Sequence, residues 1–324
     1  MVWNLEKAAI WAKDKLQKTM KTYQLEGLIN DPRIHIIQGD LSKPHLSLKQ
    51  NQYNKLAEKI DFIIHNGAHV NHIQDYESMR ETNVIGTKRL IELASIKKIK
   101  PISYISTLSS ASKTDKHGNI VEAPPSESPP SQNGYLLTKW AGEFLIHAAH
   151  ELGLPTSIIR LGNVTGHSKT GISNYHTNHT WLLTKACIKM QQAPNWDSNF
   201  EALPVDFVAK SIIGIGLNQN EGVYHLSNPK LLSWKEYIQL LNSNGYSIHF
   251  IPTKKWLKKM SSDESNPLYT LRNHYINVDE AQAPARVSTQ STEKVLSLLN
   301  LSYPSGYDPM FKVYLNYLQK EKFI

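Results

Sequence analysis

A tyrosine and a lysine four positions apart, Tyr135 and Lys139, open a predicted helix. Residues at this spacing share one helical face, and an ammonium group beside a phenol is expected to lower the phenol's pKa from about 10 towards neutrality. Tyr135 could then serve as a general acid or base. Such a pair also arises by chance among 15 tyrosines in a lysine-rich chain. Its weight comes from its position, after a strand that ends in Ser106 and Thr107.

Small and polar residues follow four of the predicted strands, at 39–41, 65–68, 106–110 and 162–166. Ligands of an open parallel sheet bind beyond the carboxyl ends of the strands. Glycine there lets a ligand approach the backbone, and asparagine or serine supplies hydrogen bonds. Any one of these segments is also typical of an ordinary turn. Four of them at the same sheet edge favour a nucleotide-type cleft.

The elements that position these residues alternate between helix and strand as far as residue 228. Strands are expected at 33–38, 61–65, 101–106, 156–160 and 223–226, and the clearest helices at 3–24, 77–95, 135–152, 179–191 and 207–217. This alternation predicts an α/β fold with a doubly wound parallel, Rossmann-like sheet. The proline-rich segment 122–131 is expected to be a loop.

The pattern changes from Trp234 onward, where short helices and a periodic helix at 310–320 follow one another. We therefore expect two domains, and the length of 324 residues agrees with that number. The Rossmann-like domain would comprise 1–165 and 200–228. A smaller, mostly helical substrate domain would comprise 166–199 and 229–324.

Composition excludes several classes of protein. The chain is 40% hydrophobic and 20% charged, as soluble globular proteins are, and its apolar runs are far shorter than the ~18 residues of a membrane span. It has one cysteine, Cys187, and a charged N-terminal stretch unlike a signal peptide. These features predict a cytoplasmic protein without disulfides or membrane association.

The net charge of +8 comes mainly from lysine, which is an unspecific signal for nucleic acid, and no nucleic-acid partner is expected. Segment 253–260 is predicted to be an amphipathic helix with four lysines. A solvated face over a buried stripe of Trp256, Leu257 and Met260 is favoured there over a docking site. His65, His69 and His72 lie close in sequence, but no third ligand at a suitable spacing accompanies either pair, so no metal site is expected.

Six motifs occur along the chain in a characteristic order. They are Asn66-Gly-Ala-His-Val-Asn71, Asn83-Val-Ile-Gly-Thr87, Ile105-Ser-Thr-Leu-Ser109, Gly134-Tyr-Leu-Leu-Thr-Lys-Trp-Ala-Gly-Glu143, Arg160-Leu-Gly-Asn-Val-Thr-Gly166 and Pro204-Val-Asp-Phe-Val208. Together they resemble the thioester reductase domains of the extended short-chain dehydrogenase/reductase superfamily. Those domains terminate nonribosomal peptide and polyketide synthetases and carboxylic acid reductases. The likeness continues to Phe323 and is specific as a set, because each motif alone is weak.

The resemblance implies a role for each matching position. Thr107, Tyr135 and Lys139 would be the catalytic triad of an NADP(H)-dependent reduction of an acyl or peptidyl thioester to an aldehyde, with further reduction to an alcohol left open. The substrate would arrive on the phosphopantetheine arm of a carrier protein. The implied cofactor-binding residues are Asp40 and Leu41 at the adenine, Asn66, Gly67 and Ala68 at the ribose and pyrophosphate, Gly162, Asn163 and Val164 at the nicotinamide, and Asn83, Ser106 and Lys139.

The sequence departs from the family near its beginning. Family members open with a strand, a glycine-rich turn and a helix, followed by a second strand and an arginine for the 2′-phosphate of NADPH. None of the 16 glycines lies in a G-x-G-x-x-G or G-x-x-G-x-x-G pattern. We therefore expect a sheet that is incomplete at its N-terminal side, an unpaired edge beside 61–65 and weakened cofactor binding.

Two other functions stay open at this point. One is a catalytically silent remnant or a carrier-binding module, which the missing glycine-rich turn favours. The other is a different extended reductase that acts on a nucleotide-sugar or a sterol-like substrate. The segment Gly171-Ile-Ser-Asn174 and the helical tail follow the thioester reductase pattern and disfavour this second alternative.

Overall fold

The computed structural model describes residues 5–71, 73–129, 131–275 and 286–324. The chain forms two compact units. The first comprises Met1–Ser112, Pro124–Ile158 and Gln219–Gly222, and the second comprises Lys113–Ala123, Ile159–Asn218 and Val223–Ile324. These bounds follow internal packing, whereas the predicted division into cofactor and substrate domains concerns binding and stays a prediction.

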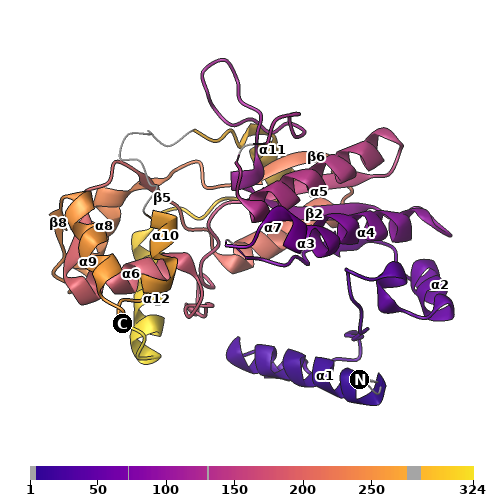
Figure 1. Ribbon diagram of the computed structural model, residues 1–324, viewed down its shortest axis with the longest axis horizontal. Helices are drawn as coiled ribbons and strands as arrows, with labels where there is room; N and C mark the ends of the chain where they lie inside the picture. The colour runs from indigo at the N-terminus through magenta and orange to yellow at the C-terminus, as the bar shows by residue number, and fades with distance from the viewer. Residues whose placement is uncertain (1–4, 72, 130, 276–285) are drawn as a thin grey trace. The chain divides into compact units, whose positions relative to one another are not determined.

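The first unit holds the N-terminal half of the elements (Figure 1). In chain order they are α1 (Leu5–Thr22), η1 (Glu26–Leu28), η2 (Pro44–Ser47), α2 (Gln50–Lys59), β1 (Ile63–His65), α3 (Tyr76–Arg80), η3 (Glu81–Ile85), α4 (Gly86–Ser95), β2 (Ile102–Thr107), η4 (Leu108–Ser110) and α5 (Gly134–Glu151). Strand β3 (Thr156–Leu161) begins in this unit. Helix α5 packs against α3, η3, α4, β2 and η4.

The main sheet has the strand order β1-β2-β3-β6, in which β6 is Gly222–Leu226. Strands β1 and β2 run parallel, with Ile63 opposite Ile102 and His65 opposite Tyr104. Apolar side chains on both faces of β2 are buried, as expected of a parallel strand covered by helices. The predicted parallel α/β architecture is therefore confirmed, and four predicted strands lie within two residues of the observed ones.

One predicted strand is missing. Over the residues described, segment 33–38 is not part of any sheet, and Ile34, Ile36 and Ile37 are 39 to 55% exposed. Its apolar pattern is that of a strand, but no neighbouring strand in the described part of the chain forms a hydrogen-bonded ladder with it. Strand β1 is correspondingly the first strand in the sheet order, with Ile64 exposed at this edge.

The predicted helix at 77–95 is interrupted. Helices α3 and α4 are joined by η3, a π-helical turn over Glu81–Ile85. Such turns insert one residue into the helix and are frequent at functional sites. The turn carries Asn83, one of the predicted cofactor-binding residues.

The second unit contains the C-terminal half of β3 and the remaining elements. They are α6 (His179–Met190), β4 (Gln192–Pro194), β5 (Asn199–Phe200), α7 (Val205–Leu217), β6, β7 (Leu232–Ser233), α8 (Trp234–Ser243), β8 (His249–Ile251), α9 (Thr253–Ser262), η5 (Tyr269–Leu271), α10 (Arg272–Tyr275), α11 (Gln290–Leu298) and α12 (Asp308–Lys320). Aromatic side chains dominate its core, and Trp181, Trp256, Tyr237 and Phe311 are fully buried. Trp256 and Met260 of α9 belong to this core, and Leu257, which is partly buried, packs against it, so two of the three residues of the predicted stripe are buried.

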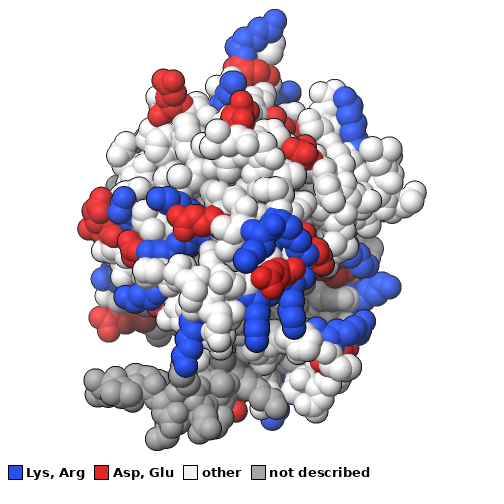
Figure 2. Space-filling model, turned by 90° about the vertical axis from the view of Figure 1, so that its right-hand side faces the viewer, with Lys and Arg blue, Asp and Glu red and all other residues white. Residues whose placement is uncertain are grey.

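The charged side chains on one face of the molecule are mixed in sign. Figure 2 shows lysine and arginine interspersed with aspartate and glutamate there, without a continuous basic surface. Over the part of the chain that is described, every helix falls short of the length and apolarity that a bilayer span requires.

Candidate active site

Thr107 lies where β2 ends and η4 begins. It is the N-cap of η4, and its Oγ1 accepts a hydrogen bond from the Ser109 amide at 3.4 Å. The residue is partly exposed, unlike the buried residues that precede it in the strand. Its hydroxyl therefore stands at the carboxyl edge of the sheet, where ligands of such sheets bind.

Tyr135 lies in the first turn of α5. The helix begins at Gly134, with Asn133 as N-cap accepting a hydrogen bond from the Leu136 amide at 3.2 Å. A Cβ at Gly134 would come within 2.5 Å of the Gln74 carbonyl oxygen, so only glycine lets the helix start this close to the beginning of α3. This contact fixes where Tyr135 stands.

Lys139 is buried one turn further along α5, with 3% of its surface exposed. Its Nζ donates a hydrogen bond to the Ile105 carbonyl oxygen at 2.6 Å and lies 3.9 Å from the centroid of the Tyr104 ring. Burial lowers the pKa of Lys139 to about 7, and the charge of Glu143 acts in the opposite direction. The lysine thus joins α5 to the last residues of β2, next to Thr107.

The expected lowering of the Tyr135 pKa is not found. Burial raises the pKa of Tyr135. The physical reason is twofold: the Lys139 ammonium is directed to β2 and Tyr104, and a lysine with a pKa of about 7 carries only part of a positive charge at neutral pH. Tyr135 is consequently a protonated phenol at neutral pH, which suits a proton donor.

The residues predicted at the adenine and ribose lie together. Asp40 and Gly67 are exposed, and Leu41 packs so closely on Gly67 that a Cβ there would approach its Cδ1 to 3.0 Å. The Asp40 carboxylate accepts hydrogen bonds from the Ser42 hydroxyl and amide, which lower the pKa of Asp40. Asn66, Gly67 and Ala68 directly follow β1. Asp40 and Leu41 are thus brought to the carboxyl end of β1, as expected for a shared ligand site.

Two other predicted cofactor-binding residues already have protein partners. Asn83 is buried, accepts a hydrogen bond from the His69 amide at 2.7 Å, and donates to the His69 carbonyl and to Thr138 Oγ1 at 2.9 Å each. Ser106 is buried and donates to Glu143 at 2.5 Å. Both residues connect α5 to its neighbours, and their role towards a cofactor stays a prediction.

The predicted nicotinamide segment, Gly162 to Val164, is held within the second unit by Glu201. This carboxylate accepts hydrogen bonds from the amides of Asn163 at 3.1 Å and Asn228 at 2.9 Å. It occupies the space where a Cβ of residue 162 would lie, which accounts for glycine at that position. The Asn163 side chain donates to Thr180 Oγ1 and to the Glu201 carbonyl. Sequence reasoning missed Glu201, since its position 38 residues away gave no signal.

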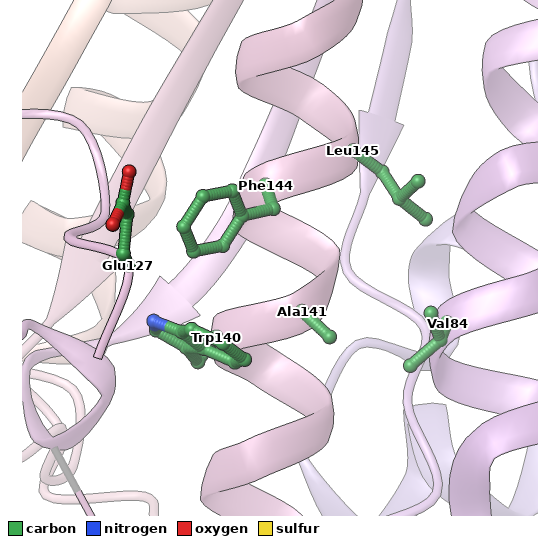
Figure 3. A pocket seen from close by; sticks show the side chains of 6 residues that line it. All are labelled: Val84, Glu127, Trp140, Ala141, Phe144 and Leu145. Carbon is green, nitrogen blue, oxygen red and sulfur yellow. The ribbon is translucent and has the colours of Figure 1, made fainter. Parts of the chain in front are cut away.

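A cavity of about 400 Å³ lies on another face of α5 (Figure 3). It is lined by Val84, Glu127, Trp140, Ala141, Phe144 and Leu145. Lys139 points from α5 to the backbone of β2. In Figure 3, by contrast, Trp140 and Phe144 extend from α5 towards Glu127, and Leu145 extends from its other side towards Val84. The cavity is therefore separate from the face that carries Tyr135 and Lys139.

Among the histidines near the predicted site, His65 has a structural role. His65 is buried and shares a 2.9 Å hydrogen bond with Thr87, and burial lowers its pKa to about 3. Among the described residues there is no group of three or more histidine, cysteine, aspartate or glutamate side chains suited to a metal ion. Cys187 is fully buried, and burial raises the pKa of its thiol.

The parallel α/β sheet, with small and polar residues after the carboxyl ends of its strands, is typical of nucleotide-binding folds. The profile of the family described as Male sterility protein (NAD_binding_4) matches residues 6–212, and the chain belongs to this family. The terminal reductase domain from the myxalamid polyketide–nonribosomal peptide pathway is 33% identical, with a TM-score of 0.87 over 97% of this chain and 82% of that one. The resemblance to thioester reductase domains is thereby confirmed.

Curated relatives are much longer than this chain. A linear gramicidin synthase protein of Brevibacillus parabrevis is 27% identical over 94% of this chain and 6% of its own length. L-2-aminoadipate reductase of Saccharomyces cerevisiae is 31% identical over 79% of this chain and 20% of its own length. Carboxylic acid reductase of Segniliparus rugosus is 30% identical over 72% and 22%. The chain spans at most about a fifth of the length of these relatives.

Proposed function

We propose that this chain reduces an acyl or peptidyl thioester, carried on a phosphopantetheine arm, to an aldehyde at the expense of NADPH. The observation that carries the proposal is the arrangement of Thr107, Tyr135 and Lys139 at the junction of β2, η4 and α5. Similarity to reductase domains of peptide synthetases and to carboxylic acid reductase supports the substrate class.

The residues present are suited to bind part of a dinucleotide cofactor, but not all of it. Asp40, Asn66 and Gly67 are exposed at the carboxyl end of β1 and would hold the adenosine half. Lys139 and Tyr135 would face the nicotinamide ribose. The sequence contains no glycine-rich turn for the pyrophosphate. When bound, the cofactor supplies the hydride that adds to the thioester carbonyl carbon.

The proton that the reduction consumes comes from a side chain of the triad. The carbonyl oxygen gains negative charge as its carbon is reduced, and the Tyr135 phenol donates its proton to that oxygen. The Thr107 hydroxyl donates a hydrogen bond to the same oxygen while its own oxygen accepts from Ser109. Lys139, protonated in part near neutral pH, would hold the nicotinamide ribose, and the Tyr135 phenolate takes up a proton from solvent.

The product of this step is a hemithioacetal. Its carbon–sulfur bond breaks, the hydroxyl proton passes to the departing sulfur, and an aldehyde and a carrier thiol result. One NADPH and one proton are consumed for each thioester, so atoms and charge balance.

The direct test measures NADPH oxidation at 340 nm with an acyl-pantetheine thioester and millimolar NADPH, and detects the aldehyde by hydrazine trapping. Equimolar NADP⁺ and aldehyde in wild type, with neither in Tyr135→Phe, would support the proposal. Absence of aldehyde with a panel of acyl and peptidyl thioesters on intact carrier protein would reject it.

A second candidate is a carrier-binding module without redox chemistry. The absence of a glycine-rich turn from the sequence favours this alternative. It predicts carrier association without NADPH oxidation at any cofactor concentration. The alternative of a nucleotide-sugar substrate has weaker support, because UDP-glucuronic acid 4-epimerase from Bacillus cereus gives a TM-score of 0.63 at 17% identity, against 0.87 for the myxalamid reductase domain.

A further inference from the structure

Glu143 is a fully buried carboxylate on α5, one helical turn beyond Lys139. The proposed mechanism gives it no role. A buried carboxylate is costly unless hydrogen bonds and a nearby positive charge stabilise it. Two serine hydroxyls supply the hydrogen bonds, because Glu143 Oε1 accepts from Ser106 at 2.5 Å and from Ser110 at 2.8 Å.

The two serines flank Thr107 in the sequence, and Ser110 also contacts it in space. Their hydroxyl oxygens lie 2.9 Å apart, and the Ser110 hydroxyl also lies 2.7 Å from the Thr107 carbonyl oxygen, as a donor. Ser110 thus shares its one proton between Glu143 and Thr107. Glu143 therefore holds Ser106, directly before Thr107, and Ser110, three residues after it. Ser110 in turn donates to the Thr107 carbonyl oxygen.

The nearby positive charge is Lys139, four residues earlier on the same helix, a spacing that places the two side chains on one face. Burial lowers the pKa of Lys139, and the Glu143 charge raises it. The other titratable groups around Lys139 are Tyr135 on α5, Tyr104 on β2 and His65 on β1, and Lys139 lowers the pKa of His65 in turn. Among these neighbours, Glu143 is the one that favours the ammonium form.

We propose that Glu143 is a positioning residue of the reductase site, which orients Thr107 through Ser106 and Ser110 and keeps Lys139 charged. This inference rests on the proposed function for its catalytic meaning. The hydrogen-bonded cluster and the charge coupling exist in the protein whether or not it turns over a substrate, so they can be tested separately.

The first test needs no activity. The titration of Lys139 is followed by NMR in protein labelled with ¹³C,¹⁵N-lysine, and Lys139→Met identifies the signal by its disappearance. Glu143→Gln keeps a hydrogen-bond acceptor for both serines and removes the charge. We expect the Lys139 midpoint to fall by about 1 pH unit or more. Glu151→Gln, an exposed change at the end of α5, should leave the midpoint where it is. An unchanged midpoint in a folded Glu143→Gln protein overturns the charge role.

The second test uses the reductase reaction at saturating substrate. A lower Lys139 pKa should move the alkaline limb of the kcat profile to lower pH in Glu143→Gln by the amount seen in the NMR titration. Ser110→Ala keeps the charge and removes the link to Thr107, so kcat should fall about tenfold or more while the limb stays in place. Wild-type kcat in a folded Ser110→Ala protein overturns the role towards Thr107. Failure of wild type to react would reject the proposed function and leave the NMR result standing.

Discussion

The phenol of Tyr104 occupies the space that a side chain at Gly142 would need. A Cβ built on Gly142 would approach Tyr104 Oη more closely than real Cβ atoms approach any atom. Tyr104 is 1% exposed and its ring forms the surface beneath Lys139 Nζ. Gly142 therefore permits the close packing of α5 on β2 that places Lys139 over the Tyr104 ring.

Gly142→Ala should destabilise the protein and misplace Lys139. The methyl group has to displace a buried ring, and overpacking of this kind costs about 1–3 kcal/mol of unfolding free energy. Urea denaturation measures the loss. Gly27→Ala is the matched control, since an added Cβ there meets nothing within 4 Å. Equal stability of the two variants would show that Tyr104 moves aside without cost.

Tyr135→Phe should abolish reductase activity while the fold is retained. The change deletes one hydroxyl group from a partly exposed residue at the start of α5, and general acid catalysis contributes about 10²–10⁴-fold to rate. Aldehyde formation measures the first expectation, and circular dichroism with urea denaturation measures the second. Turnover at the wild-type rate would mean that another group protonates the substrate oxygen.

Much of the fold could be predicted from sequence because local patterns determine it. Strands β2 and β3 are short segments rich in isoleucine and other β-branched residues and are buried on both faces, and such segments are recognisable without a partner. The same holds for α5, whose start places Tyr135 and Lys139 together. Segment 33–38 has an equally clear pattern and forms no strand in the described structure, because a strand also requires a neighbour.

The parts of the site that sequence could not predict are long-range contacts. Glu143 reaches Ser106 across 37 positions, and Glu201 reaches Asn163 across 38. Neither pair has a spacing that marks it. The expected pKa of Tyr135 was wrong for a related reason: helical spacing brings Lys139 to the right face of α5, but burial decides how much charge the lysine keeps there.

The free energy of unfolding should rise with pH over the range in which Lys139 loses its proton. The pKa of Lys139 is about 7 in the folded protein and 10.5 as its ordinary value. Below pH 7 both states hold the proton, and the cost of burying the charge is fully present. Between about 7 and 10.5 the unfolded chain binds a proton that the folded protein lacks, so the free energy of unfolding increases by up to about 1.4 kcal/mol per pH unit.

Lys139→Met removes this dependence, and its stability relative to wild type should be greatest near pH 6 and decline towards pH 10. Urea denaturation at pH 6, 8 and 10 measures the trend. Lys55→Met, at an exposed position, should show no such trend. A constant difference between Lys139→Met and wild type across this range would mean that the lysine is not desolvated in the folded state.

Carrier binding should depend on the lysine face of α9. Lys254, Lys255, Lys258 and Lys259 are exposed there, over the buried Trp256 and Met260. Carrier domains are typically acidic, and attraction between exposed charges is screened beyond about 10 Å at 0.1 M salt. Replacing the four lysines by glutamate should weaken carrier association, measured by surface plasmon resonance, and flatten its salt dependence.

The matched control reverses four exposed lysines of the first unit, Lys18, Lys21, Lys55 and Lys59, and changes the net charge equally. Weakening that is specific to the α9 variant supports a docking face. If both variants weaken carrier association equally, α9 is a helix with a solvent-exposed lysine face packed on the core, and not a docking face.

The chain of 324 residues should bind NADPH weakly. In intact sites of this class the pyrophosphate lies on a glycine-rich turn at a helix N-terminus, and an arginine pairs with the 2′-phosphate. The sequence has no such turn, so the site lacks charge-assisted hydrogen bonds of ~1.5–3 kcal/mol each. Two such losses weaken binding by about two to four orders of magnitude.

Isothermal calorimetry on the purified chain should therefore detect no saturable NADPH binding at micromolar concentrations. Fusing the strand, glycine-rich turn and helix of a related reductase domain ahead of residue 1 should restore it, because that segment supplies backbone amides for the pyrophosphate. The same fusion with the turn glycines replaced by valine controls for the added length and should bind no better than the chain alone. A micromolar or tighter dissociation constant for the unfused chain would mean that another segment binds the phosphates, and Asn66→Ala would then show whether the loop after β1 belongs to that site.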